Sequence, residues 1–99
     1  MARVELSLAA VENLDRMIVT HSLPSDTRSR VKRSLRILER FPSVGRRLEG
    51  SWKDLRFVLG PWRWLLLVYV FDEQKDLVLV VTVQDGRASA AVTHLIDPK

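Results

Sequence analysis

Residues 52–87 read WKDLRFVLGPWRWLLLVYVFDEQKDLVLVVTVQDGR. This stretch predicts three consecutive strands joined by two turns. The strands are predicted over residues 52–60, 61–72 and 77–87, with turns at Gly60-Pro61 and residues 73–76. Successive side chains of a strand point to opposite faces of a sheet, and in the last two strands both sets are apolar. In the second strand these sets are Leu65, Leu67, Tyr69 and Phe71, and Trp62, Trp64, Leu66, Val68 and Val70. Both faces must therefore be covered, and we expect helices to cover one face and a partner chain the other.

The N-terminal residues predict one strand and one helix. Residues 3–7, RVELS, alternate in the manner of a short strand, and Ser7 then takes the N-cap position of a helix that ends near His21. The buried side of this helix is predicted to be Val11, Leu14 and Ile18, with Ala10 and Met17 beside them. Because a histidine in a last helical turn most often interacts only with the helix dipole, we assign His21 no functional role.

A second helix is predicted from Ser25 or Asp26 to about Arg40, followed by a loop over residues 46–50. The buried side of this helix is predicted to be Val31, Leu35 and Leu38, flanked by Ile37 or Phe41. Two helices separated by so few residues form an antiparallel hairpin. The predicted fold is therefore α+β and two-layered, in the order β-α-α-β-β-β, with the helical hairpin on one face of a mainly antiparallel sheet. For residues 88–99 a helical turn and a fifth short strand are both consistent with the sequence.

The composition predicts one cytoplasmic domain over residues 1–99. The chain has no cysteine, which excludes a disulfide framework and a thiolate metal site. Its longest apolar run, residues 64–71, is far shorter than the roughly 20 residues that span a membrane, so no membrane partner is expected. The N-terminus carries acidic residues where a signal peptide needs an apolar core.

The charge is concentrated in the middle of the chain. Residues 28–63 contain eleven basic and three acidic side chains, whereas the whole chain has a formal net charge of +4. Four of the cations, Arg28, Lys32, Arg36 and Arg40, follow one another at a spacing of four residues and so form a stripe on the second helix. Such asymmetry attracts a polyanion or an acidic partner chain.

Six short motifs in this order resemble the RelE/ParE superfamily of bacterial toxins from type II toxin–antitoxin pairs. They are Leu6-Ser7 before an alanine-led helix, L-x-x-FP-x-x-GRRL over residues 38–48, Leu55-Arg56, G-x-aromatic-R over residues 60–63, Y-x-x-D over residues 69–72, and a strand closing on Arg87. The run from Arg63 to Tyr69 is longer than the family pattern, which predicts a β-bulge or an extended strand.

The resemblance implies a RelE-like endoribonuclease that cuts mRNA on the ribosome, with Arg56, Arg63 and Arg87 as catalytic cations. Arginine suits this role because its planar guanidinium holds a phosphate through two hydrogen bonds. The pattern departs in having Asp54 at a lysine position and Thr93-His94 at a tyrosine position, so His94 becomes the candidate acid or base. Contacts to RNA are assigned to Lys53, Arg46, Arg47 and Trp62, and no metal or other cofactor is expected.

Two alternative functions remain open at this point. ParE-like members of the superfamily share the fold and inhibit DNA gyrase by binding it. The incomplete set of catalytic groups favours this reading, whereas the compact helical hairpin and the three retained arginines argue against it. A degenerate toxin that only binds its antitoxin is the third possibility. All three readings imply a cognate acidic antitoxin as a partner, while only the first requires the ribosome and mRNA.

Overall fold

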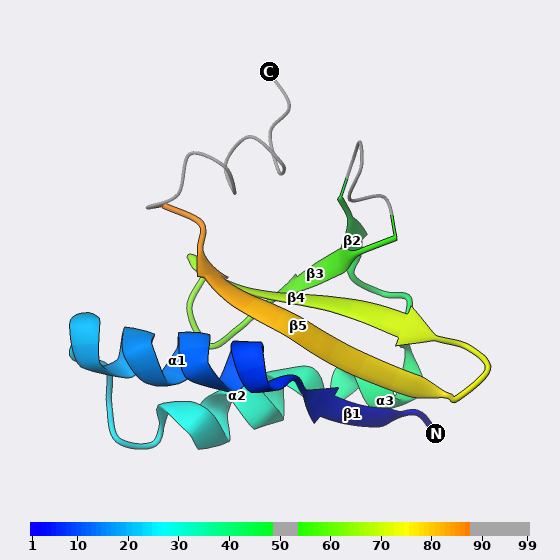
Figure 1. The fold of residues 1–99 in the computed structure, drawn as a ribbon, viewed down its shortest axis with the longest axis horizontal. Coiled ribbons are helices and arrows are strands. Elements are labelled where there is room, and N and C mark those ends of the chain that lie inside the picture. The colour runs from blue at the N-terminus through cyan, green and yellow to red at the C-terminus, as the bar shows by residue number, and fades with distance from the viewer. Residues whose placement is uncertain (49–53, 88–99) are drawn as a thin grey trace.

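The computed structural model describes residues 1–48 and 54–87, which form a five-stranded mixed sheet with helices on one face (Figure 1). The elements are β1 (Arg3–Leu6), α1 (Leu8–Thr20), α2 (Thr27–Leu35), α3 (Ile37–Arg40), β2 (Arg46–Arg47), β3 (Arg56–Leu59), β4 (Leu65–Asp72) and β5 (Leu77–Asp85). The strand order is β1-β5-β4-β3-β2, in which β1 is parallel to β5 and every other pair is antiparallel. The predicted two-layer α+β fold is therefore confirmed.

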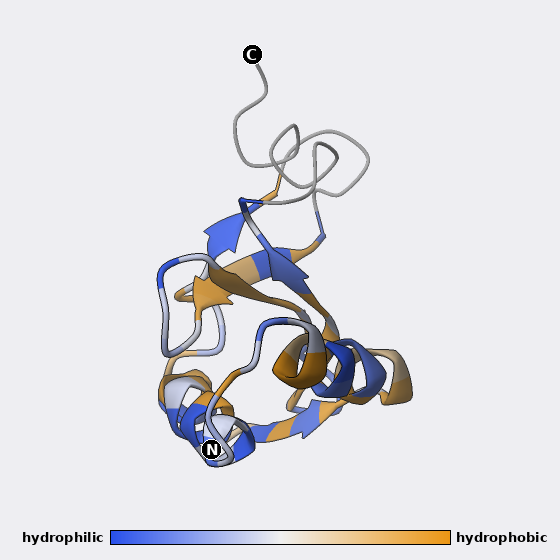
Figure 2. Ribbon diagram, turned by 90° about the vertical axis from the view of Figure 1, so that its left-hand side faces the viewer, coloured by the Kyte–Doolittle hydropathy of each residue, from blue (hydrophilic) through white to orange (hydrophobic). Residues whose placement is uncertain are grey.

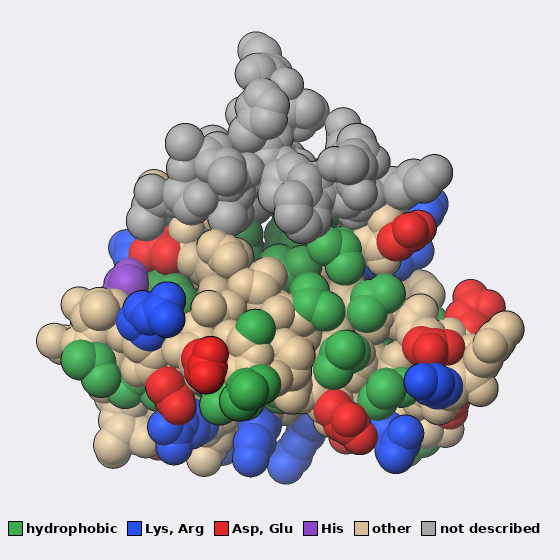
Figure 3. All heavy atoms as spheres, viewed as in Figure 1, with side chains coloured by type: hydrophobic (Ala, Val, Ile, Leu, Met, Phe, Trp, Pro, Cys, Tyr) green, Lys and Arg blue, Asp and Glu red, His purple; other side chains and the backbone are tan. Residues whose placement is uncertain are grey.

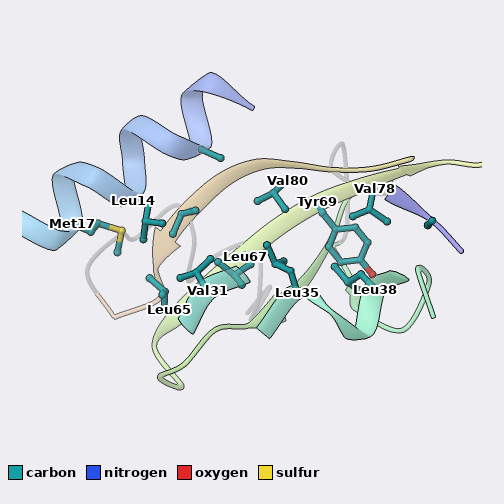
Figure 4. Close-up of a cluster of buried hydrophobic side chains, with 13 residues drawn as sticks. Leu14, Met17, Val31, Leu35, Leu38, Leu65, Leu67, Tyr69, Val78 and Val80 are labelled. Carbon is teal, nitrogen blue, oxygen red and sulfur yellow. The ribbon is translucent and has the colours of Figure 1, made fainter. Parts of the chain in front are cut away.

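The main core lies between the helices and the sheet, on what we call the helix face (Figure 4). The helices contribute Leu14 and Met17 from α1, Val31 and Leu35 from α2, and Leu38 from α3. The sheet contributes Leu65, Leu67 and Tyr69 from β4 and Val78 and Val80 from β5. Figure 2 shows each helix coloured partly hydrophobic and partly hydrophilic, as expected for helices that bury one side.

A second cluster lies on the opposite face of the sheet, the far face. It consists of Leu48, Phe57, Leu66 and Val68, with Leu55 and Val81 packed against it. The alternation predicted for residues 65–71 is thus confirmed, because odd and even positions of β4 enter different clusters. The expectation that a partner must cover this face is wrong at its centre, where Leu66 and Val68 are 4% and 5% exposed within the chain itself.

The first helix begins and ends where the sequence predicts. The Ser7 Oγ accepts a hydrogen bond from the Ala10 N–H, and after Thr20 the chain turns through Ser22, whose φ of 51° lies in the left-handed region. The Leu23 N–H then donates to the Ile18 carbonyl and closes the helix end. One predicted core position is wrong, because Val11 is 38% exposed.

The second helix is shorter than predicted, because the chain tightens at Arg36. Two backbone hydrogen bonds span only three residues there, from Arg36 N–H to the Arg33 carbonyl and from Glu39 N–H to the Arg36 carbonyl, and they separate α2 from α3. The predicted flanking residues Ile37 and Phe41 are 48% and 59% exposed. Asp26 takes the N-cap position, but its carboxylate accepts from Arg30 Nε instead of capping the helix.

Two predicted strand limits also need correction. Residues 60–64 form a turn closed by hydrogen bonds between Gly60 and Leu65 and between Trp62 and Leu65, so the tryptophans precede β4 instead of lying on it. Residues 46–47, predicted as loop, pair with β3. A β-bulge interrupts the β4–β5 pairing between Val68 and Tyr69, and its extra residue, Val81, belongs to β5. The longer run from Arg63 to Tyr69, which predicted a bulge or an extended strand, therefore does not account for it.

Within residues 1–48 and 54–87, no helix is long and apolar enough to cross a membrane.

Candidate functional site

A pocket of about 530 Å³ lies on the far face, where β4 begins and β3 and β5 end. Its walls come from the strands β2, β3 and β4, from the turn before β4 and from the two residues that follow β5. The lining residues are Arg46, Phe57, Leu59, Arg63, Trp64, Leu66, Gly86 and Arg87. Three guanidinium groups therefore surround a floor of apolar and aromatic side chains.

Two of these arginines, Arg46 and Arg63, have side chains without a polar partner among the described residues. Across the described part of the chain, neither Arg46 nor Arg63 makes a side-chain hydrogen bond or an ion pair, and both are exposed. A guanidinium group stays protonated and presents several N–H donors in one plane, which suits it to phosphate and carboxylate groups. The pocket is thus built to attract an anion that carries a flat or apolar part.

The third arginine, Arg87, is held by its neighbours. Its Nε and Nη2 each donate to the Asp85 carboxylate at 3.2 Å, and its backbone N–H donates to Asp85 Oδ1 at 2.8 Å. Its guanidinium lies over the Trp64 ring, 4.3 Å from the centroid. His21, at the end of α1, contacts the same carboxylate and stacks on the same tryptophan, with its Nε2 2.9 Å from Asp85 Oδ2.

The Asp85 carboxylate is strongly stabilised in its ionised form. The side-chain hydrogen bonds from Arg87 hold the pKa of Asp85 well below its usual range, against the opposing effect of burial. The backbone N–H of Arg87 and the His21 side chain act in the same direction as the Arg87 side chain. A negative charge therefore remains beside the pocket throughout the neutral and mildly acidic range.

A second set of contacts fixes the position of β2, and through it Arg46. The Gly45 N–H donates to the hydroxyl of the buried Tyr69 at 2.9 Å, while Arg56 Nη1 donates to the carbonyls of Ser43 and Gly45. Burial raises the pKa of the Tyr69 hydroxyl, and the Gly45 N–H and the Arg56 charge oppose this shift more weakly. We call this set of contacts among Gly45, Arg56 and Tyr69 the loop latch.

The two tryptophans of the turn before β4 form a stack that runs from α2 to the pocket. Their ring centroids are 5.8 Å apart with an interplanar angle of 13°, and the Arg30 guanidinium lies 5.9 Å from the Trp62 ring. Trp64 continues the stack toward His21 and Arg87. Protein groups already lie against these rings, so they leave little free ring surface for RNA bases. The stack instead supports the wall of the pocket.

The structure brings together three of the predicted site residues, Arg46, Arg63 and Arg87. Arg56 lies outside the pocket, since it pairs with Tyr69 on the helix face and binds the 43–45 loop. Arg47 pairs with Arg56 and is likewise absent from the pocket lining, and Trp62 lies beside the pocket in the stack. Lys53 and His94 lie outside the described residues, so their predicted roles stay predictions.

Sequence reasoning missed Asp85, Trp64 and His21 as parts of this site. A local signal existed for Asp85, because D-G-R at a strand end places a carboxylate two residues before an arginine. No local signal existed for His21, which contacts Asp85 across 64 residues of sequence. Among the described residues there is also no group of three or more His, Cys, Asp or Glu side chains able to hold a metal ion.

Comparison with known proteins places the fold. No protein-family model matches the chain, and neither does any curated protein sequence. The solved structure of the isolated E. coli RelE toxin matches with a TM-score of 0.63 and 18% identity, over 99% of this chain and 98% of that chain. The chain has a RelE-like fold.

Two further solved structures support the assignment of the RelE-like fold. The E. coli RelBE toxin–antitoxin complex matches with a TM-score of 0.62 and 17% identity, over 86% of this chain and 96% of that chain. HP0892, a conserved hypothetical protein of Helicobacter pylori, matches with a TM-score of 0.59 and 21% identity, over 88% and 97% of the two chains. The resemblance inferred from the sequence motifs is thus confirmed at the level of the fold.

Proposed function

We propose that this protein is the toxin of a type II toxin–antitoxin pair and that it acts on RNA through the arginine pocket. The observation that carries the proposal is the convergence of Arg46, Arg63 and Arg87 on one pocket in a RelE-like fold. The apolar floor of Phe57 and Leu66 suits the flat face of a base, and the guanidinium groups suit its phosphates.

The proposed reaction is cleavage of mRNA on the ribosome, with the RNA 2′-hydroxyl as the nucleophile. As that oxygen attacks the adjacent phosphorus, negative charge grows on the phosphorane and on the leaving 5′ oxygen, and the arginines offset it. A base must take the 2′-hydroxyl proton and an acid must protonate the leaving oxygen. Among the described lining residues none is a carboxylate, imidazole or amine, so we assign proton transfer to His94.

The missing proton-transfer group in the described lining also favours the second candidate function. Under that reading the pocket binds an acidic surface of DNA gyrase, and the protein inhibits without cleaving anything. The two functions separate in a pair of assays, a coupled translation extract and a gyrase supercoiling reaction. Cleaved message with lost translation supports the ribonuclease, and lost supercoiling supports the gyrase inhibitor.

Arginine substitutions test the pocket itself. Arg63→Ala is expected to lower the cleavage rate by roughly 10²- to 10³-fold, because it removes one cation aimed at the developing charge. Arg3→Ala is the matched control, since Arg3 lies on β1 at the opposite edge of the sheet and its side chain makes a surface ion pair with Glu5. Equal activity of the two variants in the translation assay would show that cleavage does not use this pocket.

A cognate acidic antitoxin is the proposed partner. The support is the net positive charge of residues 28–63 and the resemblance to the toxin of the RelBE complex. Lys32, Arg36 and Arg40 are exposed on α2, α3 and the residue between them, whereas Arg28 is already paired with Asp15 of α1. An acidic segment that folds on binding can wrap such a surface and place its carboxylates beside these cations. Co-purification with a co-expressed acidic neighbour, lost at high salt, tests this interaction.

A further inference from the structure

The carboxylate of Asp85 joins α1 to the pocket. Its two oxygens receive three hydrogen bonds from Arg87, and Oδ2 also lies 2.9 Å from Nε2 of His21. The Asp85 side chain is only 9% exposed, whereas the Arg87 side chain is 60% exposed. A carboxylate with little exposure thus fixes one edge of an arginine whose side chain also lines the pocket.

His21 is itself held in place on both sides of its ring. Its Nδ1 lies 2.8 Å from Thr20 Oγ1, and the ring stacks on Trp64 with a centroid distance of 5.3 Å and an interplanar angle of 11°. Trp64 in turn lies beneath the Arg87 guanidinium. His21 therefore reaches Arg87 by two routes, through the Asp85 carboxylate and through the Trp64 ring, although it does not line the pocket.

We propose that His21 and Asp85 are positioning residues that fix the Arg87 guanidinium at the pocket. The proposal rests on the proposed binding of RNA there. β5 ends at Asp85, so Arg87 lies beyond the backbone pairing of the sheet. Among the described residues, its side chain is held by Asp85 and Trp64, and His21 orients both.

The imidazole of His21 restrains the Asp85 carboxylate. Its Nε2 contacts Oδ2 of Asp85, while the Nε and backbone N–H of Arg87 both donate to Oδ1, so each carboxylate oxygen is held. Without the imidazole, the contact that remains at Oδ2 among the described residues is the one from Arg87 Nη2, and the Trp64 ring loses the ring stacked on it. Loss of His21 should therefore loosen the Arg87 guanidinium and weaken anion binding at the pocket.

The test measures binding of a short single-stranded RNA with 2′-O-methyl riboses, which resists cleavage. Fluorescence anisotropy at pH 8 and fixed ionic strength should show several-fold weaker binding for His21→Ala than for the unaltered protein, because this variant loses the contacts that orient Asp85 and Trp64. His21→Gln keeps an N–H donor for Asp85 and should recover most of the affinity. Val19→Gln is the matched control on the same helix and should bind as the unaltered protein does, because the Val19 side chain is exposed.

A second readout separates positioning from folding. The Nε–H proton of Arg87 donates to Asp85 Oδ1, so its NMR signal should be protected from exchange in the unaltered protein and in His21→Gln. His21→Ala should lose that protection and weaken binding several-fold at pH 8, while circular dichroism shows it folded. An RNA affinity that is unchanged in His21→Ala would overturn the proposal, as would a protected Arg87 signal in that variant. If the unaltered protein binds no RNA, the proposed function fails, and the Arg87 signal still decides the positioning role.

Discussion

Replacing Gly45 with alanine should break the loop latch. A methyl group at Gly45 would stand 2.6 Å from Tyr69 Oη and 2.7 Å from both the Phe57 carbonyl oxygen and Tyr69 Cε1. Tyr69 is fully buried and the carbonyl belongs to the backbone of β3, so neither neighbour can yield without moving the sheet. Overpacking costs about 1–3 kcal/mol, and loss of the hydrogen bond from Gly45 to Tyr69 costs about 1 kcal/mol more. The free energy of unfolding should therefore fall by about 2–4 kcal/mol.

Urea unfolding followed by tryptophan fluorescence measures this loss. With a typical slope of about 2 kcal/mol per M, the midpoint should fall by about 1–2 M. Gly60→Ala is the matched control, because its added methyl group would meet only the Leu65 side chain, at 3.0 Å and beyond. A Gly45→Ala midpoint within about 0.3 M of the control would refute the latch, since the close contacts would then be relieved without cost.

Three further predictions concern stability. Arg56→Ala should lower the free energy of unfolding by about 1–3 kcal/mol, because it removes both charge-assisted hydrogen bonds to the 43–45 loop. Thermal unfolding measures this change, and an unchanged melting temperature would contradict the structural role of Arg56. Leu38→Ala should cost about 2–5 kcal/mol in urea unfolding, because Leu38 is 0% exposed in the main core, whereas Ile37→Ala, at 48% exposure, should cost far less. Because the pKa of Asp85 is lowered on folding, its ionised form stabilises the protein above the unfolded-state value of about 4, and this contribution is lost as the pH falls below it. The difference in unfolding free energy between the unaltered protein and Asp85→Asn should therefore be constant from pH 8 to about 5 and shrink below about pH 4; a difference still constant at about pH 3 would argue against the Arg87 hydrogen bonds.

The sequence predicted the features that depend on residues close together in the chain. Alternation along residues 65–71 determined which side chains of β4 face the helices, and Ser7 marked the start of α1. The break at Arg36 was not predictable, because the apolar spacing of Val31, Leu35 and Leu38 continues through it. Helical periodicity records which side is buried and says little about a single tightened turn.

The site was predicted less completely, because its key contacts join distant segments. The sequence identified Arg63 and Arg87 as site residues, and both line the pocket. It identified Arg56 on the same grounds, as an arginine at a strand end, but Arg56 lies on the helix face. Only the pairing register shows that Arg56 stands opposite Tyr69, on the helix face. His21 and Asp85 meet because α1 packs against β5, and no spacing rule connects them.

The place of β5 between β1 and β4 bears on how the chain folds during synthesis. The first strand made, β1, pairs with β5, the last strand among the described residues, since Arg3 stands opposite Leu77 and Leu6 opposite Val80. While only residues up to β4 have been made, the N-terminal strand therefore has no neighbour in the sheet, and such long-range pairing slows folding. The same C-terminal segment that completes the sheet delivers Arg87 to the pocket. A prematurely terminated chain that lacks β5 consequently has neither β1 paired in the sheet nor Arg87 in the pocket, and the pocket lining is complete only when translation has passed Arg87.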